Sequence, residues 1–399
     1  MKILVVTQYY YPEQFRITDI CEELAKNGHE VTVLTGLPNY PEGKILKDYK
    51  WFRNRNQKIK NVIIKRTNLI GRGSNPIKLC FNYLSFMING SIRARLMIEK
   101  YDVVYCYQMS PITQMVAAIN AKKHSKCKLV ISCLDIWPES LKSYGINENS
   151  FIYKQIGKFS SYLYRKCDKI LVSSNGFTDY LVTECKVKRE NISFLANHAE
   201  NEYLTYSNAI HSRDKVKFLF AGNIGKAQNL QVIIKALSVV KPSSLNRIEV
   251  GILGDGSYMK ELKKLVIENK LENSFKFYGR KPLSKIKKYY EDADVFLLTL
   301  EGGTFVSNTI PAKLQGYMGA GRPIAGCING GSMDIIKEAK CGLCAEADDY
   351  KGLAEIFEKY ICDSSLLEEY GNNGREYFKE NFTIEKFISS LERTLEKEC

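Results

Sequence analysis

The chain has 399 residues, of which 45% are hydrophobic and 26% are charged, and its formal net charge is +14. This length suits two domains of similar size, and the composition excludes a disordered or fibrous protein. The charge is uneven: residues 1–200 hold 30 Lys and Arg against 17 Asp and Glu, whereas residues 201–399 hold 28 against 27.

The basic residues are densest between Lys44 and Arg72, where ten Lys and Arg face only Asp48. Such a patch is typical of proteins that bind nucleic acid, anionic lipid or an anionic small substrate. The first residues, Met1–Thr7, indicate a β-strand and no signal peptide, and no apolar run reaches the roughly 20 residues of a membrane-spanning helix. We therefore expect a cytoplasmic protein.

The first half alternates short β-rich segments with helical patterns, which predicts a parallel sheet built from βαβ units. One helix is expected between the first two strands, from Ile17 to Asn27, and it ends at Gly28. The expected strands of this half are Lys2–Thr7, Val31–Thr35, Val62–Lys65, Val103–Cys106, Leu129–Ser132 and Ile170–Ser173.

A further helix, from Pro76 to Met97, is unusual because it is apolar nearly all round and carries Arg93 and Arg95 near its end. A buried helix of the first domain and an interfacial helix that lies on a bilayer both fit this pattern. The basic patch in the same half of the chain favours the interfacial interpretation.

Polar and aromatic residues follow three strands of the first half, at the ends where ligands bind in such folds. Arg16 is suited to meet a phosphate there. Asp135 is suited to accept a hydrogen bond from a sugar hydroxyl or to act as a base, although it also fits a helix cap. Asp135 is the candidate catalytic residue. The candidate residues for binding the molecule that carries this hydroxyl, the acceptor, are Tyr11, Arg16, Asn39, Tyr40, Trp137 and Glu139.

The series of strands restarts after a polar stretch, Asn197–Asp214, which predicts an interdomain linker. The fold class is therefore α/β, with two Rossmann-like doubly wound domains, residues 1–200 and 201–382, that face a cleft. The expected strands of the second half are Val216–Ala221, Ile248–Leu253, Phe275–Tyr278, Val295–Thr299 and Pro323–Cys327.

Three glycine-containing turns follow strands of the second half, and together they describe the wall of a nucleotide pocket. Glycine at a strand-to-helix turn lets backbone N–H groups approach a phosphate, and Lys226 adds a mobile positive charge. The turn after the first of these strands is not GxGxxG, so the nicotinamide fingerprint is absent. The candidate residues for binding this nucleotide, called the donor below, are Gly222, Asn223, Gly225, Gln228, Gly254, Asp255, Gly256 and Arg280.

A loop rich in small polar residues, Leu300–Ile310, leads into a helix with Thr309 as the expected N-cap and Pro311 in the first turn. The free N–H groups at the start of such a helix attract anions, and Lys313 lies within its first turn. Lys313 and Lys226 are therefore candidate catalytic residues, and the donor-binding set gains Glu301, Ser307, Asn308 and Thr309.

Two motifs that resemble metal sites are expected to have other roles. Cys341–Cys344 is a lone CxxC without a second pair at zinc spacing, which predicts a turn, and the cysteines are expected to be reduced. Asp292–Asp294 is expected at a junction of helix and strand. No metal site or cofactor is predicted, and structural roles are expected for His29, His124, His198 and His211.

On these residues the sequence resembles family 4 glycosyltransferases, the retaining group with the GT-B fold. It is most similar to the branch that builds bacterial capsule and O-antigen repeat units, including N-acetylfucosamine transferases. The resemblance covers essentially the whole chain and rests on Ile3–Tyr11, Gly28–Val33, Pro38–Lys44, Asp135–Ser140, Gly222–Leu230, Gly254–Gly256, Asp294–Leu297, Pro311–Lys313 and Tyr317–Pro323.

The resemblance implies a UDP-linked donor held by the second domain, retention of configuration, no metal, and a C-terminal helix in residues 383–399 that crosses back to the first domain. The chain departs from the family pattern at three points. The frequent active-site histidine of the first domain has no counterpart here, and Asp135 lies in that region. Two glutamates eight residues apart correspond here to Asn308 and Gly316, so Glu301 or Gln315 is expected to replace the ribose-binding carboxylate. The common arginine and lysine after the phosphate turn correspond to Asn223 and Gln228.

The resemblance thus implies a hexosyltransferase that moves a sugar, an N-acetylated deoxyhexosamine, from a UDP-sugar to a polyprenyl-diphosphate-linked glycan acceptor in capsule or O-antigen polysaccharide synthesis. It is expected on the inner face of the cell membrane, bound peripherally to anionic lipid and not to nucleic acid. Two alternatives stay open. The helix Pro76–Met97 is an argument against a UDP-sugar 2-epimerase on the same fold, and the missing glutamates favour a non-catalytic nucleotide- or lipid-binding scaffold.

Overall fold

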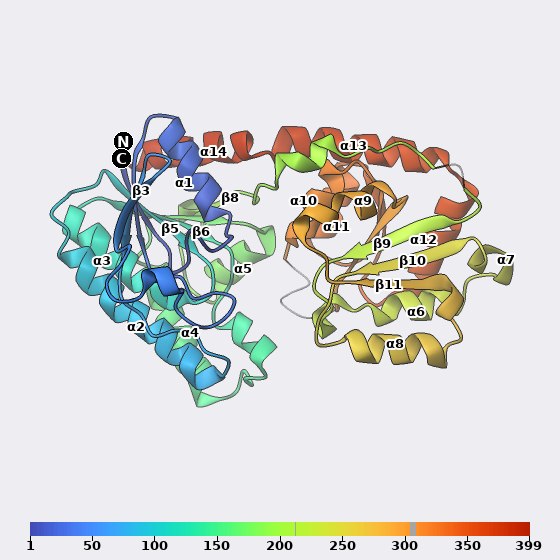
Figure 1. Cartoon of the computed structure of the whole chain (residues 1–399), viewed down its shortest axis with the longest axis horizontal. Helices are drawn as coiled ribbons and strands as arrows, with labels where there is room; N and C mark the ends of the chain where they lie inside the picture. Colours follow the sequence, from blue (N-terminus) through green and yellow to red (C-terminus); the bar gives the residue numbers. More distant parts are fainter. Residues whose placement is uncertain (212, 304–308) are drawn as a thin grey trace. The chain divides into compact units, whose positions relative to one another are not determined.

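The computed structural model describes residues 1–211, 213–303 and 309–399. The chain divides into two compact units (Figure 1). The first unit consists of Met1–Leu195 together with Ile388–Cys399, and the second unit consists of Ala196–Phe387. Each unit is built on one β-sheet, so the described residues form two sheets that do not share a strand.

The sheet of the first unit has eight strands in the order β3-β4-β2-β1-β5-β6-β7-β8, and only β3 runs antiparallel to its neighbour. The six strands predicted in this half are present. Two short strands were not predicted, because β3 is a polar edge strand and β8 has only three residues. The strands are β1 Lys2–Val6, β2 Glu30–Thr35, β3 Asn56–Ile59, β4 Val62–Arg66, β5 Val103–Gln108, β6 Lys128–Cys133, β7 Lys169–Val172 and β8 Ile192–Phe194.

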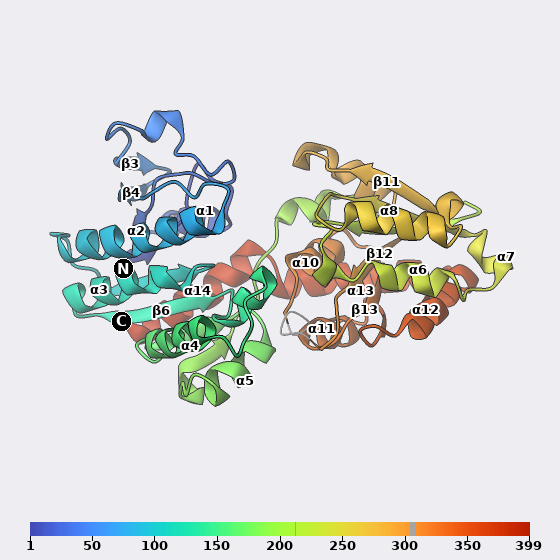
Figure 2. The same cartoon turned by 90° about the horizontal axis from the view of Figure 1, so that it is seen from below.

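Helices cover both faces of this sheet. α2, α3 and α4 lie on one face, and α1 lies on the other with the end of α14 (Figures 1 and 2). Hydrogen bonds join Asn27 and His29 at the end of α1 to Glu392 of α14. The helices are α1 Ile17–Lys26, α2 Pro76–Arg95, α3 Met115–Ser125, α4 Phe151–Tyr164, α5 Asn175–Thr183 and α14 Ile384–Glu398.

The sheet of the second unit has six parallel strands in the order β11-β10-β9-β12-β13-β14. One face packs against α6, α8 and α12, and the other against α10, α11 and α13. The elements are β9 Val216–Ala221, α6 Gln231–Leu237, α7 Pro242–Leu245, β10 Ile248–Leu253, α8 Met259–Glu268, β11 Phe275–Gly279, α9 Lys287–Glu291, β12 Val295–Thr299, α10 Ala312–Gly319, β13 Ile324–Cys327, α11 Gly331–Glu338, β14 Gly342–Ala345, α12 Tyr350–Cys362 and α13 Ser365–Asn381.

The strand order reverses once in each sheet, between β1 and β5 in the first and between β9 and β12 in the second. In doubly wound sheets, ligands bind outside the carboxyl ends of the strands at such a reversal. The predicted fold class, α/β with two Rossmann-like doubly wound domains, is confirmed. The reversals direct attention to the loops that follow β1, β5, β9 and β12.

Two sequence predictions about local structure are wrong. The segment Cys341–Cys344 is not a turn, because most of it forms β14, which pairs with β13 at the edge of the sheet. The polar stretch predicted as a linker packs on the second unit in its described part. Ala199 and Tyr206 are buried there, and Arg375 of α13 donates a hydrogen bond to the Tyr206 carbonyl at 2.7 Å.

The predicted helix after Pro76 is present as α2, but most of its apolar side chains are not buried. Phe86 is the one large apolar side chain of α2 that is buried. The others include an exposed stripe at helical spacing, formed by Ile77, Phe81, Leu84, Ile88 and Ile92. The buried-helix interpretation therefore fails for this stripe. Among the described residues, no helix is both long and apolar enough to span a bilayer.

Candidate active site

Glycine turns after β9 and β10 form one continuous backbone surface in the second unit. Gly222 and Gly254 adopt φ angles of 144° and 141°, which side chains disfavour. A side chain on Gly254 would collide with the Gly222 carbonyl, and one on Gly256 with the Ile224 carbonyl. The Gly222 N–H group donates to the Leu253 carbonyl at 2.9 Å. Two of the turns predicted to face a phosphate are therefore packed against each other.

Lys313 lies against this backbone surface. It is the second residue of α10, and its ammonium lies 3.8 Å from the centroid of the Phe220 ring. The same ammonium is 2.9 Å from the position that a Cβ atom on Gly222 would occupy. Burial lowers the pKa of Lys313 to about 7, and no carboxylate of the described residues opposes this effect. A poorly hydrated ammonium without a counter-ion favours binding of an anion.

Tyr317 holds α10 in this position. Its hydroxyl donates to the Ala221 carbonyl at 3.1 Å and accepts from the Ala221 N–H at 2.9 Å. Its ring stacks on Phe296, with 4.1 Å between the centroids. Because Tyr317 lies one helical turn after Lys313, these bonds fix Lys313 beside the end of β9.

The other predicted residues of the turn after β9 differ in whether their polar groups are free to contact a ligand. Asn223 and Lys226 are exposed. The N–H group of Gly225, predicted to face a phosphate, donates instead to the Gln228 side-chain carbonyl at 3.0 Å. A ligand can use the Gly225 N–H only if Gln228 moves away, because a single N–H makes one well-aligned hydrogen bond.

The predicted residues after β10, β11 and β12 surround the same edge of the sheet. The Asp255 carboxylate accepts from the Gly256 N–H at 2.8 Å, so it closes its own turn. Arg280 is exposed directly after β11. Glu301 follows β12, and its N–H donates to the Ala227 carbonyl at 3.0 Å. This last bond joins the loop after β12 to the turn after β9.

The start of α10 differs from the prediction. The N-cap is Pro311 and not Thr309, because Pro311 has an extended backbone with ψ of 136° and the helix begins at Ala312. Thr309 is half-buried ahead of the helix. The candidate residues Ser307 and Asn308 lie outside the described residues. Lys313 is therefore closer to the helix start than the sequence indicated, where the free N–H groups are concentrated.

Gln315, expected to replace the missing ribose-binding carboxylate, is turned into the unit. Its side chain is 1% exposed. With the amide oriented to suit its neighbours, Nε2 donates to the Ala312 carbonyl of the same helix at 2.9 Å. This contact stabilises the first turn of α10 and leaves Gln315 unable to reach a ligand. Of the two predicted substitutes, Glu301 alone remains at the strand-end edge.

In the first unit, Asp135 lies in a group of hydroxyls after β6, the strand next to the reversal of the sheet. It is half-buried after β6, and its two carboxylate oxygens accept hydrogen bonds from the hydroxyls of Ser110 and Ser140. The Trp137 indole donates to the Ser110 hydroxyl at 2.9 Å, and the Gln108 side chain donates to the Asp135 carbonyl at 3.1 Å. The arrangement holds a carboxylate ready to bind hydroxyl groups.

Trp137 and Glu139, predicted to contact the acceptor, face the interior instead. Trp137 is 6% exposed, and its ring meets Tyr83 of α2 with 6.5 Å between the centroids. The Glu139 carboxylate accepts from the Tyr153 hydroxyl at 2.5 Å and pairs with Lys142 at 3.0 Å. Because both side chains are covered and their polar groups engaged, they support the site and do not contact a ligand.

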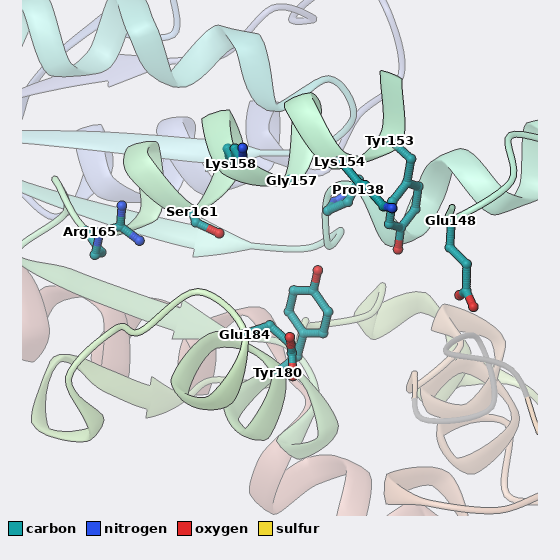
Figure 3. A pocket seen from close by; sticks show the side chains of 10 residues that line it. All are labelled: Pro138, Glu148, Tyr153, Lys154, Gly157, Lys158, Ser161, Arg165, Tyr180 and Glu184. Atoms are coloured by element: carbon teal, nitrogen blue, oxygen red, sulfur yellow. The ribbon is translucent and has the colours of Figure 1, made fainter. Parts of the chain in front are cut away.

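A cavity of about 400 Å³ is lined by residues of α4 and α5 together with Pro138 and Glu148 (Figure 3). Lys154 and Lys158 line it from α4, one turn apart on the same face of the helix, and Arg165 lines it directly after the end of α4. The Tyr180 side chain points toward them from α5, and Glu184 of the same wall adds an acidic group. The cavity is polar, with more basic than acidic groups on α4.

The remaining predicted acceptor residues follow β1 and β2. Tyr11 and Tyr40 are 40% and 41% exposed, and Arg16 is half-buried at the start of α1. Asn39 is fully buried, and its amide donates to the Leu37 carbonyl at 2.9 Å. Asn39 therefore shapes the loop and does not meet a ligand, contrary to the prediction.

The Asp292–Asp294 motif joins α9 to β12, as predicted. It precedes β12 and so lies at the amino edge of the sheet, opposite the glycine turns. The Asp292 carboxylate pairs with Lys217 and with Arg213, the latter at 3.1 Å. The Asp294 carboxylate accepts from the Lys217 N–H at 2.8 Å. These carboxylates form ion pairs and hydrogen bonds at the amino edge of the sheet, away from Lys313.

Two residues that build the site were not selected from the sequence. Ser110 lies two residues after the end of β5, so a polar residue near a strand end, beside Pro111, is a usable signal. No local signal exists for the Tyr317 hydroxyl, because its partner Ala221 lies 96 residues away in the chain.

Comparison with known proteins agrees with this geometry. Residues 15–199 match the family described as Glycosyltransferase Family 4, and residues 207–377 match the family described as Glycosyl transferases group 1. The chain is 26% identical over 279 residues to the probable glycosyltransferase WbjE of Pseudomonas aeruginosa, which covers 66% of this chain and 68% of the relative. It is 22% identical to the putative colanic acid biosynthesis glycosyl transferase WcaI of Escherichia coli, over 100% of this chain and 97% of that one.

Among solved structures, HepE (Alr3699) of Anabaena in complex with UDP is similar over 100% of both chains, with a TM-score of 0.71 and 15% identity. At this level of identity the likeness concerns the fold alone. The two family matches lie one in each half of the chain. The protein is a glycosyltransferase with the GT-B fold.

Proposed function

We propose that this glycosyltransferase takes a sugar from a UDP-linked donor held by the second unit and transfers it to a lipid-linked glycan acceptor bound by the first. The observation that carries the proposal is the unpaired Lys313 ammonium beside the bare backbone of Gly222 and Gly254. A diphosphate supplies the negative charge that this ammonium lacks, and the glycines allow it to approach closely. The structure of HepE with UDP supports a uridine nucleotide.

The chemistry follows from where charge develops. As the bond between the sugar and the diphosphate breaks, negative charge grows on the leaving phosphate, and Lys313 and Lys226 stabilise it together with N–H groups at the start of α10. Because these lysines supply the positive charge, the proposal includes no metal ion or other cofactor. The acceptor oxygen bonds to the anomeric carbon with retention, and its proton passes to the leaving phosphate.

On the acceptor side, Asp135 orients the reacting hydroxyl. Each of its carboxylate oxygens accepts one serine hydroxyl, and each retains a lone pair for a further hydrogen bond. The names of the relatives, which include a colanic acid biosynthesis transferase, support a polysaccharide repeat unit as the acceptor. The similarity of the sequence to capsule and O-antigen transferases supports an N-acetylated deoxyhexosamine as the donor sugar.

A polyprenyl diphosphate is the proposed carrier of the acceptor, at the inner face of the cell membrane. The cavity beside α4 supports a diphosphate, because Lys154 and Lys158 of that helix and Arg165 directly after it line the wall. The apolar stripe of α2 supports contact with acyl chains, and Trp51 and Phe52 are 86% and 78% exposed in the basic segment. Apolar groups beside basic residues suit an anionic membrane surface.

One incubation tests the proposed function against its alternatives. The purified protein is mixed with radiolabelled UDP-N-acetylhexosamines and a bacterial membrane extract, with the Lys313→Met variant as control. Label in the lipid fraction, lost in the variant, is the expected result. Conversion to an isomeric sugar nucleotide would indicate an epimerase, and UDP binding without either product would indicate a scaffold.

A further inference from the structure

A buried carboxylate holds the loop that follows β2. Glu13, in the loop after β1, is 7% exposed. Its Oε1 accepts hydrogen bonds from the N–H groups of Asn39 and Tyr40, both at 2.7 Å, and its Oε2 accepts from the Tyr10 N–H at 3.3 Å. Charge-assisted bonds of this kind are strong, and removing the acceptor leaves the buried N–H groups unpaired. Glu13 therefore determines the path of the backbone at Asn39 and Tyr40.

Asn39 connects this loop to other segments of the first unit through hydrogen bonds. Its side-chain carbonyl accepts from the Arg72 N–H at 2.9 Å and from the Asn82 amide at 3.3 Å. Asn82, on α2, accepts in turn from the Gln8 amide at the end of β1, at 2.7 Å. Asn39, Asn82 and Gln8 are almost completely buried. The loops after β1, β2 and β4 are thus joined to α2 by one buried polar network.

The network presents the ring of Tyr40 to the surface. This side chain is 41% exposed. Its ring lies 5.4 Å from Phe15 and 6.0 Å from Tyr9 between centroids, and the Arg72 guanidinium lies 5.4 Å from its centroid. An aromatic ring held on several sides offers a flat apolar face and a hydroxyl at its tip, which suits packing against a sugar ring.

We propose that Glu13 is a positioning residue for the acceptor: its carboxylate holds the Asn39–Tyr40 backbone so that the Tyr40 ring packs against the acceptor sugar. This inference rests on the proposed function, in which the first unit binds the acceptor. Glu13 does not touch the acceptor, because the loop that it holds covers it. The donor-binding turns of the second unit are built without Glu13, so use of the donor serves as an internal reference.

Protonation gives this arrangement a recognisable signature. Burial raises the pKa of Glu13 to about 7, although the three N–H groups and Arg66 act in the opposite direction. The other titratable groups beside it are Tyr10 and Tyr49, whose pKa values are raised by burial, and Arg66, whose pKa is lowered by burial. Below pH 7 the carboxyl group becomes neutral, its hydrogen bonds weaken, and the loop is held less firmly.

The test compares Glu13→Gln with Glu42→Gln, a matched change at an exposed glutamate of the same loop. At saturating UDP-sugar, we expect the KM for the lipid-linked acceptor to rise about tenfold in Glu13→Gln and to stay unchanged in Glu42→Gln. The KM for the donor is expected to stay within twofold in both. In the wild type the acceptor KM rises as the pH falls from 8 to 6, and in Glu13→Gln this dependence is lost.

Two further measurements keep the inference falsifiable. Tyr40→Ala leaves the carboxylate in place and is expected to raise the acceptor KM as Glu13→Gln does, while the pH dependence of donor use is unaffected. Hydrogen exchange at the N–H groups of Asn39 and Tyr40 is expected to accelerate in Glu13→Gln at an unchanged Tm. An unchanged acceptor KM in either variant, or unchanged exchange, overturns the role of Glu13. A wild type that modifies no acceptor refutes the proposed function instead, and hydrogen exchange still decides whether Glu13 holds the loop.

Discussion

At the scale of single residues, the buried positive charge of Lys313 lowers the stability of the ligand-free protein, and the same charge favours binding of an anion. Burial lowers its pKa from 10.5 to about 7, so the folded protein favours the neutral amine. Below pH 7 the ammonium is charged in both the folded and the unfolded chain, so its burial lowers the free energy of unfolding by the full amount. This loss of stability is relieved as the pH rises from about 7 toward the unfolded value of 10.5. A bound diphosphate removes the same cost at neutral pH.

Replacing Lys313 by Met keeps the bulk of the side chain and removes the ammonium. We expect kcat/KM to fall about ten- to a hundredfold, because a charge-assisted contact to phosphate contributes about 1.5–3 kcal/mol. Near pH 6 the Tm should not fall, since no unpaired charge remains buried. Lys337→Met, at an exposed lysine of α11, is the control and should behave as wild type. Unchanged kcat/KM in Lys313→Met would exclude Lys313 from the site.

The lowered pKa of Lys313 also predicts that UDP binding is coupled to proton uptake. At pH 8 the amine is mostly neutral in the free protein, and a neighbouring diphosphate raises its pKa. Calorimetric titrations in two buffers of different ionisation enthalpy should reveal uptake of up to about one proton per UDP. Lys313→Met should bind UDP more weakly and without uptake. A binding enthalpy in the wild type that does not depend on the buffer would show that the diphosphate lies elsewhere.

At the scale of secondary-structure elements, the edge of a sheet decides what a motif can do. The carboxyl ends of β9, β10 and β12 bring together the glycine turns, Glu301 and the start of α10. The acidic pair Asp292 and Asp294 precedes β12 and is engaged with Arg213 and Lys217. A similar pair at the opposite edge would resemble a metal site, but here the positive charge near the candidate donor site comes from lysines.

Transfer should therefore survive a chelator. We expect activity with excess EDTA to equal activity with Mg²⁺ or Mn²⁺ within experimental error, because Lys313 and Lys226 offset the charge of the leaving phosphate. The assay is transfer of label to the lipid fraction after dialysis against EDTA. Loss of activity with recovery on adding Mn²⁺ would contradict this account of charge compensation.

The helix α2 offers a matched pair of phenylalanines with opposite surroundings. Phe86 is 0% exposed and Phe81 is 54% exposed on the same helix. Phe86→Asp should unfold the first unit, because it buries an unpaired charge and removes about 3–5 kcal/mol of packing. Phe81→Asp should keep the wild-type Tm and lose binding to liposomes, measured by co-sedimentation. A folded Phe81→Asp variant that binds liposomes normally would show that this stripe does not touch the membrane.

At the scale of the whole molecule, the charge distribution separates the two halves of the chain. The excess of basic residues lies in residues 1–200, whereas residues 201–399 are nearly neutral. Each basic residue near an anionic surface contributes up to about 1 kcal/mol, and salt screens this attraction over about 8–10 Å. The half of the chain that carries the apolar stripe of α2 therefore also carries the charge that attracts anionic lipid.

A charge reversal tests this asymmetry. Lys50, Arg53 and Lys58 are exposed, and changing all three to Glu should weaken binding to phosphatidylglycerol liposomes about tenfold or more at low salt. The control changes three exposed lysines of the second unit, Lys235, Lys260 and Lys351, and should leave binding intact. Wild-type binding should fall as salt rises. Equal, negligible binding to neutral and anionic liposomes at low salt would contradict docking on the membrane.

The sequence by itself determined the architecture. Alternating strand and helix patterns predicted most strands and both sheets, because a parallel strand buried on both faces must be a short, nearly continuous apolar run. The sequence also located the strand-end turns that contain Gly222 and Gly254 and the first turn of the helix that contains Lys313. It did not predict β3, a polar edge strand that pairs with the neighbouring β4, or the short edge strands β8 and β14.

Only the tertiary structure decided which candidate side chains face a ligand. Asn39, Trp137, Glu139 and Gln315 follow the right strands or begin the right helix, yet all four are covered. Exposure depends on which distant segment packs against a residue, and local composition does not encode that. For the same reason the loss of solvation at Lys313, which makes it an anion site, follows from a β-strand and a helix that meet across about ninety residues of chain.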